Sequence, residues 1–344
     1  MIKMKNIILT VVFLVLIILL FAFVSLYKSA QVREVVIYTS LDQIFSEPIL
    51  KDFEKETGIK VKAVYDVEAA KTTGLVNRLI AEKDNPQADV FWNSEVGRTL
   101  VLKRKGVLQP YFSVSAKNIP LQLKDSQGYW TGFAVRARVI LVNTDLVKSG
   151  EEPKSIFDLT KQEWNEQVAI ANPLFGTTAT HSSALFVKLG EEKAKKYFQQ
   201  LKANEASILA GNSTVRDYVV EGKLKVGLTD TDDANLAVQE GKPVKIIYPD
   251  QGTMGTLVIP NTIALIKGAP HSEEGKQLID YILSEEVESK LAYSGSMQIP
   301  VRPTVKTPEY VPAIGKIKAM DVNYEDIADE MEHSGKILKE TFLR

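Results

Sequence analysis

The sequence predicts an α/β fold divided into two lobes, on three observations. Its 344 residues are more than a single hydrophobic core normally serves. A β-branched run from Glu34 to Tyr38, a helical period and a second run from Ile59 to Tyr65 follow one another, which is the pattern of a parallel strand–helix–strand crossover. Polar residues then follow successive strands, where ligands bind in open α/β sheets.

Composition excludes several classes of function. The net charge of −1 falls to −4 once the three lysines of residues 1–30 are set aside, so the chain lacks the basic surface of a nucleic-acid-binding protein. The absence of cysteine excludes disulfides, thiolate metal sites and a lipid-modified cysteine anchor. Only three histidines are present, which argues against a histidine-rich zinc site. No nucleophile motif, phosphate-binding loop or metalloprotease helix occurs, and this favours binding over catalysis.

The N-terminus carries an export signal. Lys3 and Lys5 precede an uncharged apolar run from Ile7 to Leu26, whose basic end should remain in the cytoplasm. The run is long enough to span a bilayer, and cleavage after Ala30 would place Lys28 where a small residue is wanted. We therefore expect an uncleaved anchor rather than a cleaved signal peptide. In either case the remainder works in the periplasm or at the outer face of the cytoplasmic membrane.

The first lobe should present polar groups at two strand ends. Thr39-Ser40-Leu41-Asp42-Gln43 follows the first strand, and a helix behind it ends at Thr57-Gly58. A helical stretch from Gly74 to Lys83 precedes a further strand, Ala88 to Trp92, which is followed by Asn93-Ser94-Glu95. Ser40, Asp42 and Glu95 should therefore meet at one edge of the sheet. Ordinary loop roles are the alternative.

The second lobe offers groups suited to an anion. Arg136 and Arg138 share one face of an extended segment, Trp130 to Val142. Gly176-Thr177-Thr178 leads into a helix, and Asn212 begins a later one, so free backbone N–H groups could face an anion. Simple N-capping by Thr177 or Thr178 is the alternative. His181 is interpreted as a helix-surface or packing residue rather than a ligand.

Three acids lie close together in Gly227-Leu228-Thr229-Asp230-Thr231-Asp232-Asp233-Ala234, between an apolar run and a helix predicted from Asn235 to Glu240. Like charges this close disfavour mutual ionisation, and the motif contains no base, so an external positive partner is expected. Carboxylates are hard donors suited to a metal ion or a cationic group. Helix capping by Asp230 or Thr231 is the alternative, compatible with the first.

The rest of the chain completes the α/β pattern. Pro260, in the extended segment Leu257 to Ile266, indicates an edge strand or a crossing between lobes. The remaining predicted elements are a strand from Val168 to Asn172, a helix from Glu192 to Leu201, a strand from Val244 to Tyr248, and helices from His271 to Leu283 and from Glu285 to Tyr293.

Five segments together carry a family resemblance: residues 36–43, 53–61, 88–93 and 172–178, and the Asp230 cluster. The sequence resembles the family 1 extracellular solute-binding proteins, in the iron(III)-type branch that serves ABC importers, from about residue 34 to about residue 305. The resemblance implies a type II periplasmic-binding-protein fold with a double crossover near Arg136 and Asn261, and last helices that return across the lobes. We expect residues 1–30 to form the signal peptide or membrane anchor. Residues 31–135 and 262–305 should form lobe 1, and residues 136–261 and 306–344 should form lobe 2.

The resemblance also implies the ligand sites, with one departure. Ferric-binding members coordinate the metal with two adjacent tyrosines, and the matching positions here are Asp232 and Asp233. Asp230, Glu95 and Asp42 join them as expected cation ligands. Arg136, with Arg138 as its competitor, should hold a co-anion. The residues expected beside Arg136 are Gly176, Thr177, Thr178, Asn212, Ser40 and Asp42.

The function implied is that of a monomeric, non-enzymatic binding protein that closes over ferric iron with a carbonate- or phosphate-like co-anion and delivers it to a membrane permease. Capture of a small organic anion such as a phosphonate is the alternative. A metal-dependent extracytoplasmic enzyme is a third candidate, but the sequence shows no clear group to activate water.

Overall fold

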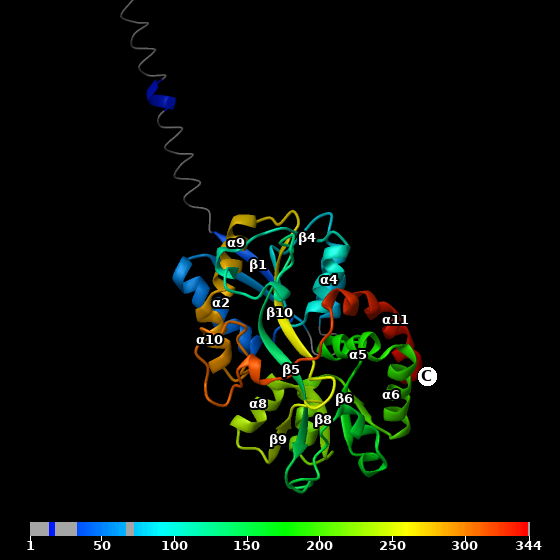
Figure 1. Ribbon diagram of the computed structural model, residues 1–344. Coiled ribbons are helices and arrows are strands. Elements are labelled where there is room, and N and C mark those ends of the chain that lie inside the picture. The colour runs from blue at the N-terminus through cyan, green and yellow to red at the C-terminus, as the bar shows by residue number, and fades with distance from the viewer. Residues whose placement is uncertain (1–13, 18–32, 67–71, 343–344) are drawn as a thin grey trace, which may run out of the picture.

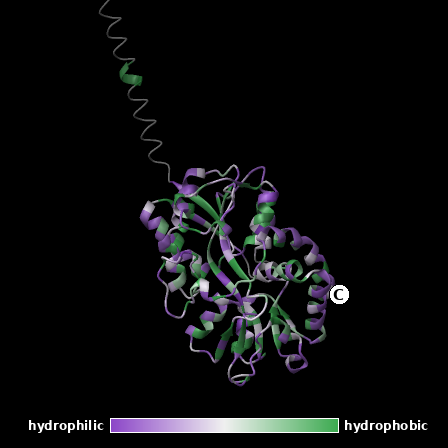
Figure 2. Cartoon of the chain, viewed as in Figure 1, coloured by the Kyte–Doolittle hydropathy of each residue, from purple (hydrophilic) through white to green (hydrophobic). Residues whose placement is uncertain are grey.

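The computed structural model describes residues 14–17, 33–66 and 72–342. It contains two α/β lobes, one above the other in Figure 1, which confirms the predicted fold class. Each lobe has its own large apolar core. In Figure 2 the strands and the inner helix faces are mostly hydrophobic, whereas the outer helix faces are hydrophilic.

The sheet of lobe 1 runs in the order β2-β1-β3-β10-β5. Strands β1 (Glu34–Thr39), β2 (Lys60–Tyr65) and β3 (Val90–Asn93) are parallel, so the predicted crossover unit is confirmed. β10 (Val258–Ile266) is antiparallel to β3 and to β5 (Thr131–Asn143). β4 (Leu108–Gln109) pairs with β10.

The helices of lobe 1 follow the apolar periods in the sequence. α2 (Gln43–Thr57) buries Ile49, Leu50 and Phe53, and it ends at Gly58, whose φ of 70° lies in the left-handed region that glycine tolerates. The other helices are α3 (Thr73–Ala81), α4 (Val96–Arg104), α9 (Ser272–Ile282) and α10 (Glu285–Tyr293). Of these, α4 was not predicted from the sequence.

In lobe 2 the sheet order is β5-β8-β6-β7, and β9 also pairs with β5. The strands are β6 (Val168–Ala171), β7 (Ser207–Leu209), β8 (Val226–Asp230) and β9 (Val244–Ile247). The helices are α5 (Gly176–Leu189), α6 (Glu191–Ala203), α7 (Asn212–Val220) and α8 (Thr231–Gln239). α8 begins four residues earlier than predicted, so Asp232 and Asp233 lie in its first turn.

One glycine allows α7 to approach β8 closely. A Cβ atom on Gly227 would lie 2.5 Å from Cγ1 of Val215 and 3.0 Å from Cγ2 of Val219, both on α7. Such distances are shorter than van der Waals contact, so only glycine fits without movement of the helix. This close packing brings the start of α7, and with it Asn212, beside the end of β8.

Strands β5 and β10 pass between the lobes. Ile259 belongs to the core of lobe 2 and Ile263 to that of lobe 1, and the register with β5 shifts between Pro260 and Asn261. β10 as a whole lies between β3 and β5, but β3 pairs only with residues 262–265, so Pro260 is paired on the β5 side alone, as in an edge strand. Pro260 also lies where β10 crosses between the lobes, as the second alternative expected.

The C-terminal helix α11 (Tyr324–Phe342) contacts both lobes. Glu325 accepts a hydrogen bond from Arg104 of α4 at 2.8 Å, and the Ser334 hydroxyl lies 2.9 Å from that of Ser183 on α5. The predicted domain boundaries, which give 306–344 to lobe 2, stay a prediction.

Of the predicted membrane anchor, Ile7 to Leu26, all but residues 14–17 lies outside the described residues. Among the helices that are described, none is long and apolar enough to cross a membrane.

Candidate ligand-binding site

The candidate site lies where the ends of β1 and β3 in lobe 1 meet β5, β8 and the start of α5 in lobe 2. In lobe 1, the Ser40 hydroxyl donates to Asn93 Oδ1 at 2.7 Å and accepts from the Ser94 backbone N–H at 2.8 Å. All three residues are buried. These contacts fix the 93–95 turn, and they use the Ser40 hydroxyl for structure rather than leaving it to a ligand.

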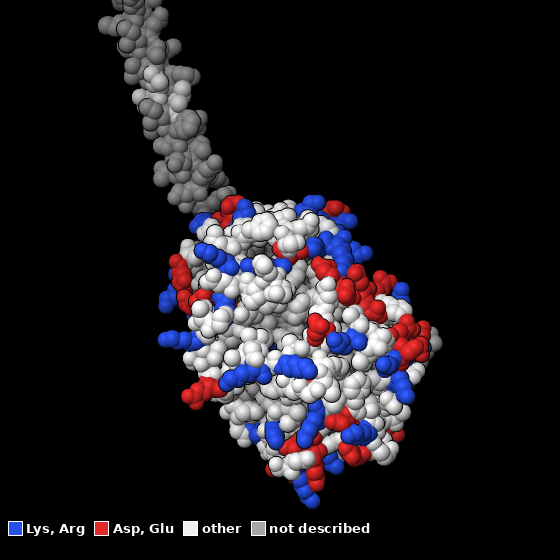
Figure 3. Space-filling model, viewed as in Figure 1, with Lys and Arg blue, Asp and Glu red and all other residues white. Residues whose placement is uncertain are grey.

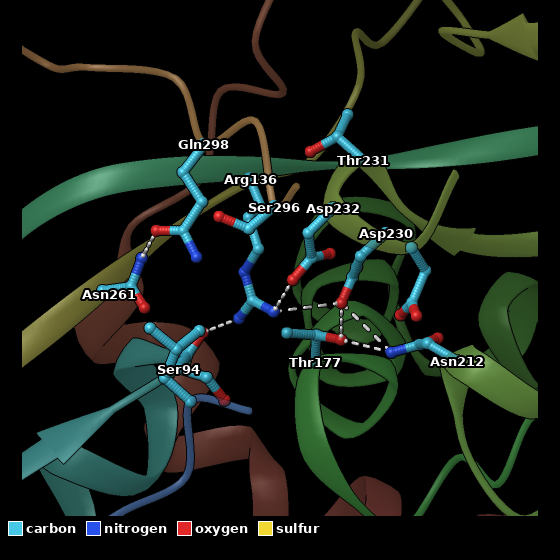
Figure 4. A network of polar contacts seen from close by, with 12 residues as sticks. Ser94, Arg136, Thr177, Asn212, Asp230, Thr231, Asp232, Asn261, Ser296 and Gln298 are labelled. Atoms are coloured by element: carbon cyan, nitrogen blue, oxygen red, sulfur yellow. Dashed lines mark hydrogen bonds and ion pairs between the residues drawn. The ribbon is translucent and has the colours of Figure 1, made fainter. Parts of the chain in front are cut away.

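Arg136 joins the two lobes. Its guanidinium donates to Asp232 Oδ2 at 2.9 Å and to the backbone carbonyl of Ser94, and it is 3% exposed. Burial alone would lower the pKa of Arg136, but the charges of Asp232 and Asp230 outweigh burial and raise it. Figure 4 shows this guanidinium between Ser94 and the two aspartates. The buried cation is therefore fully charged and bound from both sides.

Arg138 forms the second half of the network, deeper in lobe 2. It donates to Asp230 Oδ1 at 2.6 Å, to Asn212 Oδ1 at 3.0 Å and to Thr177 Oγ1 at 3.2 Å. Asp230 also accepts from Thr177 at 2.5 Å and from Asn212 at 3.1 Å. Burial would raise the pKa of Asp230, but the charges of Arg138 and Arg136 lower it. Asp230 is consequently ionised and satisfied by this lobe alone.

These contacts revise the sequence interpretation of the anion group. Thr177, Thr178 and Asn212 surround Arg138, the competitor, whereas Arg136 faces Ser94 and Asp232. Neither threonine caps α5, because the N-cap is Phe175 and its side chain makes no capping bond. Gly176 enters the helix with a φ of 55°, a left-handed conformation that glycine adopts readily.

The acid cluster finds its positive partners on other strands and helices rather than in an added cation. Asp230 pairs with Arg138, Asp232 with Arg136, and Asp233 Oδ1 lies 3.3 Å from Arg216 of α7. The expected capping is wrong, since Asp230 makes no side-chain capping bond, and the Thr231 hydroxyl accepts from the backbone N–H of Ala137 at 3.1 Å instead.

In the part of the chain that the structure describes, no three acidic or histidine side chains are grouped closely enough to hold a metal ion. The predicted cation set of Asp230, Asp232, Asp233 and Glu95 therefore stays a prediction. It requires a rearrangement of the arginine pairs.

Glu95 bridges the lobes. It is fully buried, its carboxylate accepts from the Arg98 backbone N–H at 2.9 Å, and it accepts from the Thr180 hydroxyl of α5 at 2.6 Å. Burial raises the pKa of Glu95 against the opposing effects of Thr180 and Arg98. Asp42 is the N-cap residue of α2, and its charge is among those that raise the pKa of Arg136.

Several residues of the site were not predicted from the sequence. Thr180 lay within the hydroxyl-rich turn but was not singled out. Gln298 and Asn261 meet at the crossing, where the Asn261 amide donates to Gln298 Oε1 at 2.7 Å, and Figure 4 shows them to the left of Arg136. His181 is a packing residue as expected, though buried rather than on the surface, and burial followed by the charge of Arg138 lowers the pKa of His181 to about 3.

Comparison with known proteins places this arrangement in a family. Residues 85–329 match the family described as bacterial extracellular solute-binding protein. The chain belongs to this family. This solute-binding protein is 27% identical to the iron uptake protein A1 of Synechocystis over 320 residues, which cover 90% of this chain and 87% of that one.

Two further proteins resemble this chain. A putative 2-aminoethylphosphonate-binding periplasmic protein of Salmonella typhi is 28% identical over 288 residues, covering 80% of this chain and 81% of that one. The ferric binding protein from Campylobacter jejuni superposes with a TM-score of 0.81 at 24% identity, covering 90% of this chain and 99% of that one. That likeness shows the two-lobed periplasmic-binding-protein fold. The family match identifies the protein as a solute-binding protein and not an enzyme.

Proposed function

We propose that this solute-binding protein captures ferric iron, together with a small co-anion, between its lobes and delivers it to the membrane permease of an ABC importer. The observation that carries the proposal is the concentration of carboxylates at one junction between the lobes, in a chain related to a protein named for iron uptake. Asp232, Asp233 and Glu95 supply hard oxygen donors from both sides of that junction, and such donors suit a hard, highly charged cation.

Iron would have to compete with arginine in this site. Asp232 is held by Arg136 at 2.9 Å and Asp230 by Arg138 at 2.6 Å. A cation that takes these carboxylates frees the guanidinium groups, which can then bind the co-anion through paired hydrogen bonds. Cation and co-anion would thus bind cooperatively, because each relieves the charge that the other leaves unpaired.

A second candidate, a small organic anion such as a phosphonate, is favoured by the arginines themselves. Arg136 and Arg138 are both buried, and Arg138 lies beside Thr177 and Asn212, so an anion could enter this site by displacing a carboxylate. The relative named for 2-aminoethylphosphonate binding supports this candidate. An amine on such a ligand would then pair with the displaced aspartates.

Titration separates the two candidates. Metal-stripped protein is titrated with ferric citrate and, separately, with 2-aminoethylphosphonate, calcium and manganese. The variants are Asp232→Asn/Asp233→Asn and, as a control, Asp326→Asn on the exposed first turn of α11. Thermal melts of each variant establish that it is folded before binding is compared.

The iron proposal predicts that wild type and the control bind ferric iron and that the double variant does not. Wild-type protein that binds the phosphonate but no cation would establish the second candidate instead. A folded double variant that binds iron as tightly as wild type would show that these aspartates are not the ligands.

A further inference from the structure

Exposed apolar side chains gather in one short segment of lobe 1. Among the described residues after Arg33, four large apolar side chains are at least two-thirds exposed, and three of them are Phe112 at 70%, Val114 at 79% and Leu121 at 79%. The segment forms two short 3-10 helices, η2 (Val114–Ala116) and η3 (Leu121–Leu123). Single exposed apolar residues need no explanation, but a contiguous group of this kind marks an interaction surface.

The surface contains a cavity and has a basic rim. A cavity of about 380 Å³ is lined by apolar groups that include Tyr111, Phe112 and Leu121, and by Lys117 and Lys124. The one acid in its wall, Asp125, is neutralised by Lys103 at 2.5 Å. Figure 3 shows a broad uncharged area on the upper lobe, with both basic and acidic side chains along its border. The surface is therefore both apolar and net positive.

Helix α9 connects this surface to the start of the folded chain. Arg33 pairs with Glu274 in the first turn of α9 at 3.0 Å. Asp280, six residues further and thus about 9 Å along the helix, accepts from Tyr111 at 2.8 Å and from Ser113 at 2.5 Å. The apolar surface and the point where the N-terminal run enters lobe 1 consequently flank one short helix.

The link to the predicted anchor is short. Six residues lie between Leu26, the end of the apolar run, and Arg33, and an extended chain over these seven residue steps reaches about 24 Å at most. An uncleaved anchor would hold this side of lobe 1 within that distance of the bilayer. Apolar groups bordered by lysines suit the interface of an anionic membrane.

We propose that residues 112–124 form a membrane-contact surface that rests on the lipid headgroups beside the N-terminal anchor. Phe112, Val114 and Leu121 enter the interfacial region, while Lys117 and Lys124 pair with anionic headgroups. The surface orients lobe 1 on the membrane. The inference is independent of the cargo and rests on retention of the anchor.

A labelling experiment on the full chain tests this inference. The chain contains no cysteine, so an environment-sensitive fluorophore can be attached at Leu121→Cys or, as a control in lobe 2, at Val238→Cys, where the native side chain is 45% exposed. The labelled chains are reconstituted into vesicles of phosphatidylethanolamine and phosphatidylglycerol that contain headgroup-level spin-labelled lipid as quencher.

We expect the label at position 121 to be quenched and blue-shifted, and the label at position 238 to be neither. Each lysine near an anionic surface contributes about fivefold to membrane attraction, so Lys117→Gln/Lys124→Gln should lower the docked-to-free ratio by about 25-fold. Replacing the anionic vesicles with phosphatidylcholine vesicles should likewise lower the docked-to-free ratio.

Three results would overturn the proposal. The first is an unquenched label at position 121 in a chain that stays with the vesicles. The second is release of the chain from the vesicles. The third is a spectral shift that depends on protein concentration rather than on quencher lipid, which would assign the surface to a second copy of the chain.

Discussion

Removal of Arg138 should reveal how strongly the buried network depends on charge pairing. Arg138 is fully buried and contributes three hydrogen bonds to Asp230, Asn212 and Thr177. Breaking a buried ion pair by removing one partner costs about 3–5 kcal/mol. In Arg138→Met, Asp230 keeps Thr177 and Asn212 as donors and Arg136 at 3.6 Å. We therefore expect the lower end of that range, about 3 kcal/mol.

Removing the acid of this ion pair should cost more stability than removing the base. Asp230→Asn retains the shape of the side chain but leaves Arg138 buried without a carboxylate, so we expect a loss of about 4 kcal/mol. The double variant, Arg138→Met/Asp230→Asn, leaves neither of these charges buried without its partner. It should therefore cost about 3 kcal/mol less than the sum of the two single losses, a coupling within the range seen for neighbouring residues.

Urea denaturation with m-values checks this double-mutant cycle. The exposed pair Lys336 and Glu332, whose atoms lie 2.9 Å apart, supplies a matched cycle in which coupling should be close to undetectable because solvent screens it. Additive losses at Arg138 and Asp230, to within about 0.5 kcal/mol, would refute the argument that charge pairing holds the network together.

Three further predictions concern single positions. The buried imidazole of His181 has a pKa lowered to about 3, so the stability of the wild type should fall as pH drops from 6.5 toward 3, by up to about 1.4 kcal/mol per pH unit. His181→Leu should abolish this dependence. An unchanged slope of stability against pH in urea melts would contradict this. Glu95→Gln should gain stability relative to wild type as pH rises from 4 to 8, since a raised pKa makes ionised Glu95 unfavourable in the folded state; a constant difference in melting temperature would count against it. Gly227→Ala should cost about 1–3 kcal/mol, because its Cβ would meet Val215 at 2.5 Å, and a neutral effect would show that α7 yields freely.

Local patterns were sufficient to predict most, but not all, of the elements. The parallel pairing of β1 with β2 and the end of α2 at Gly58 follow from β-branched runs, helical period and glycine, all of which act over a few residues. The residue pattern did not predict α11, and only the family resemblance implied last helices that return across the lobes. This helix is amphipathic, but its burial depends on α4 and α5, which lie far away in sequence. No short-range pattern shows where such a helix will pack.

The candidate site could be predicted only in part, because pairing across strands depends on register. The acids at the end of β8 and the arginines of β5 were identified from the sequence, but the positive partner expected for the acids was a metal ion or a cationic group. The antiparallel pairing of Arg138 with Asp230 across β5 and β8 supplies that charge. Alternation along β5 put Arg136 and Arg138 on one face, yet only the three-dimensional fold assigns Thr177 and Asn212 to Arg138.

The identity of the bound ligand tests the proposed function most directly. Protein purified without added ligand is measured by native mass spectrometry and elemental analysis of the same sample. We expect iron in equimolar amount with the chain, and an added mass that corresponds to iron plus a small anion. A bound phosphorus-containing organic molecule with no iron would contradict it.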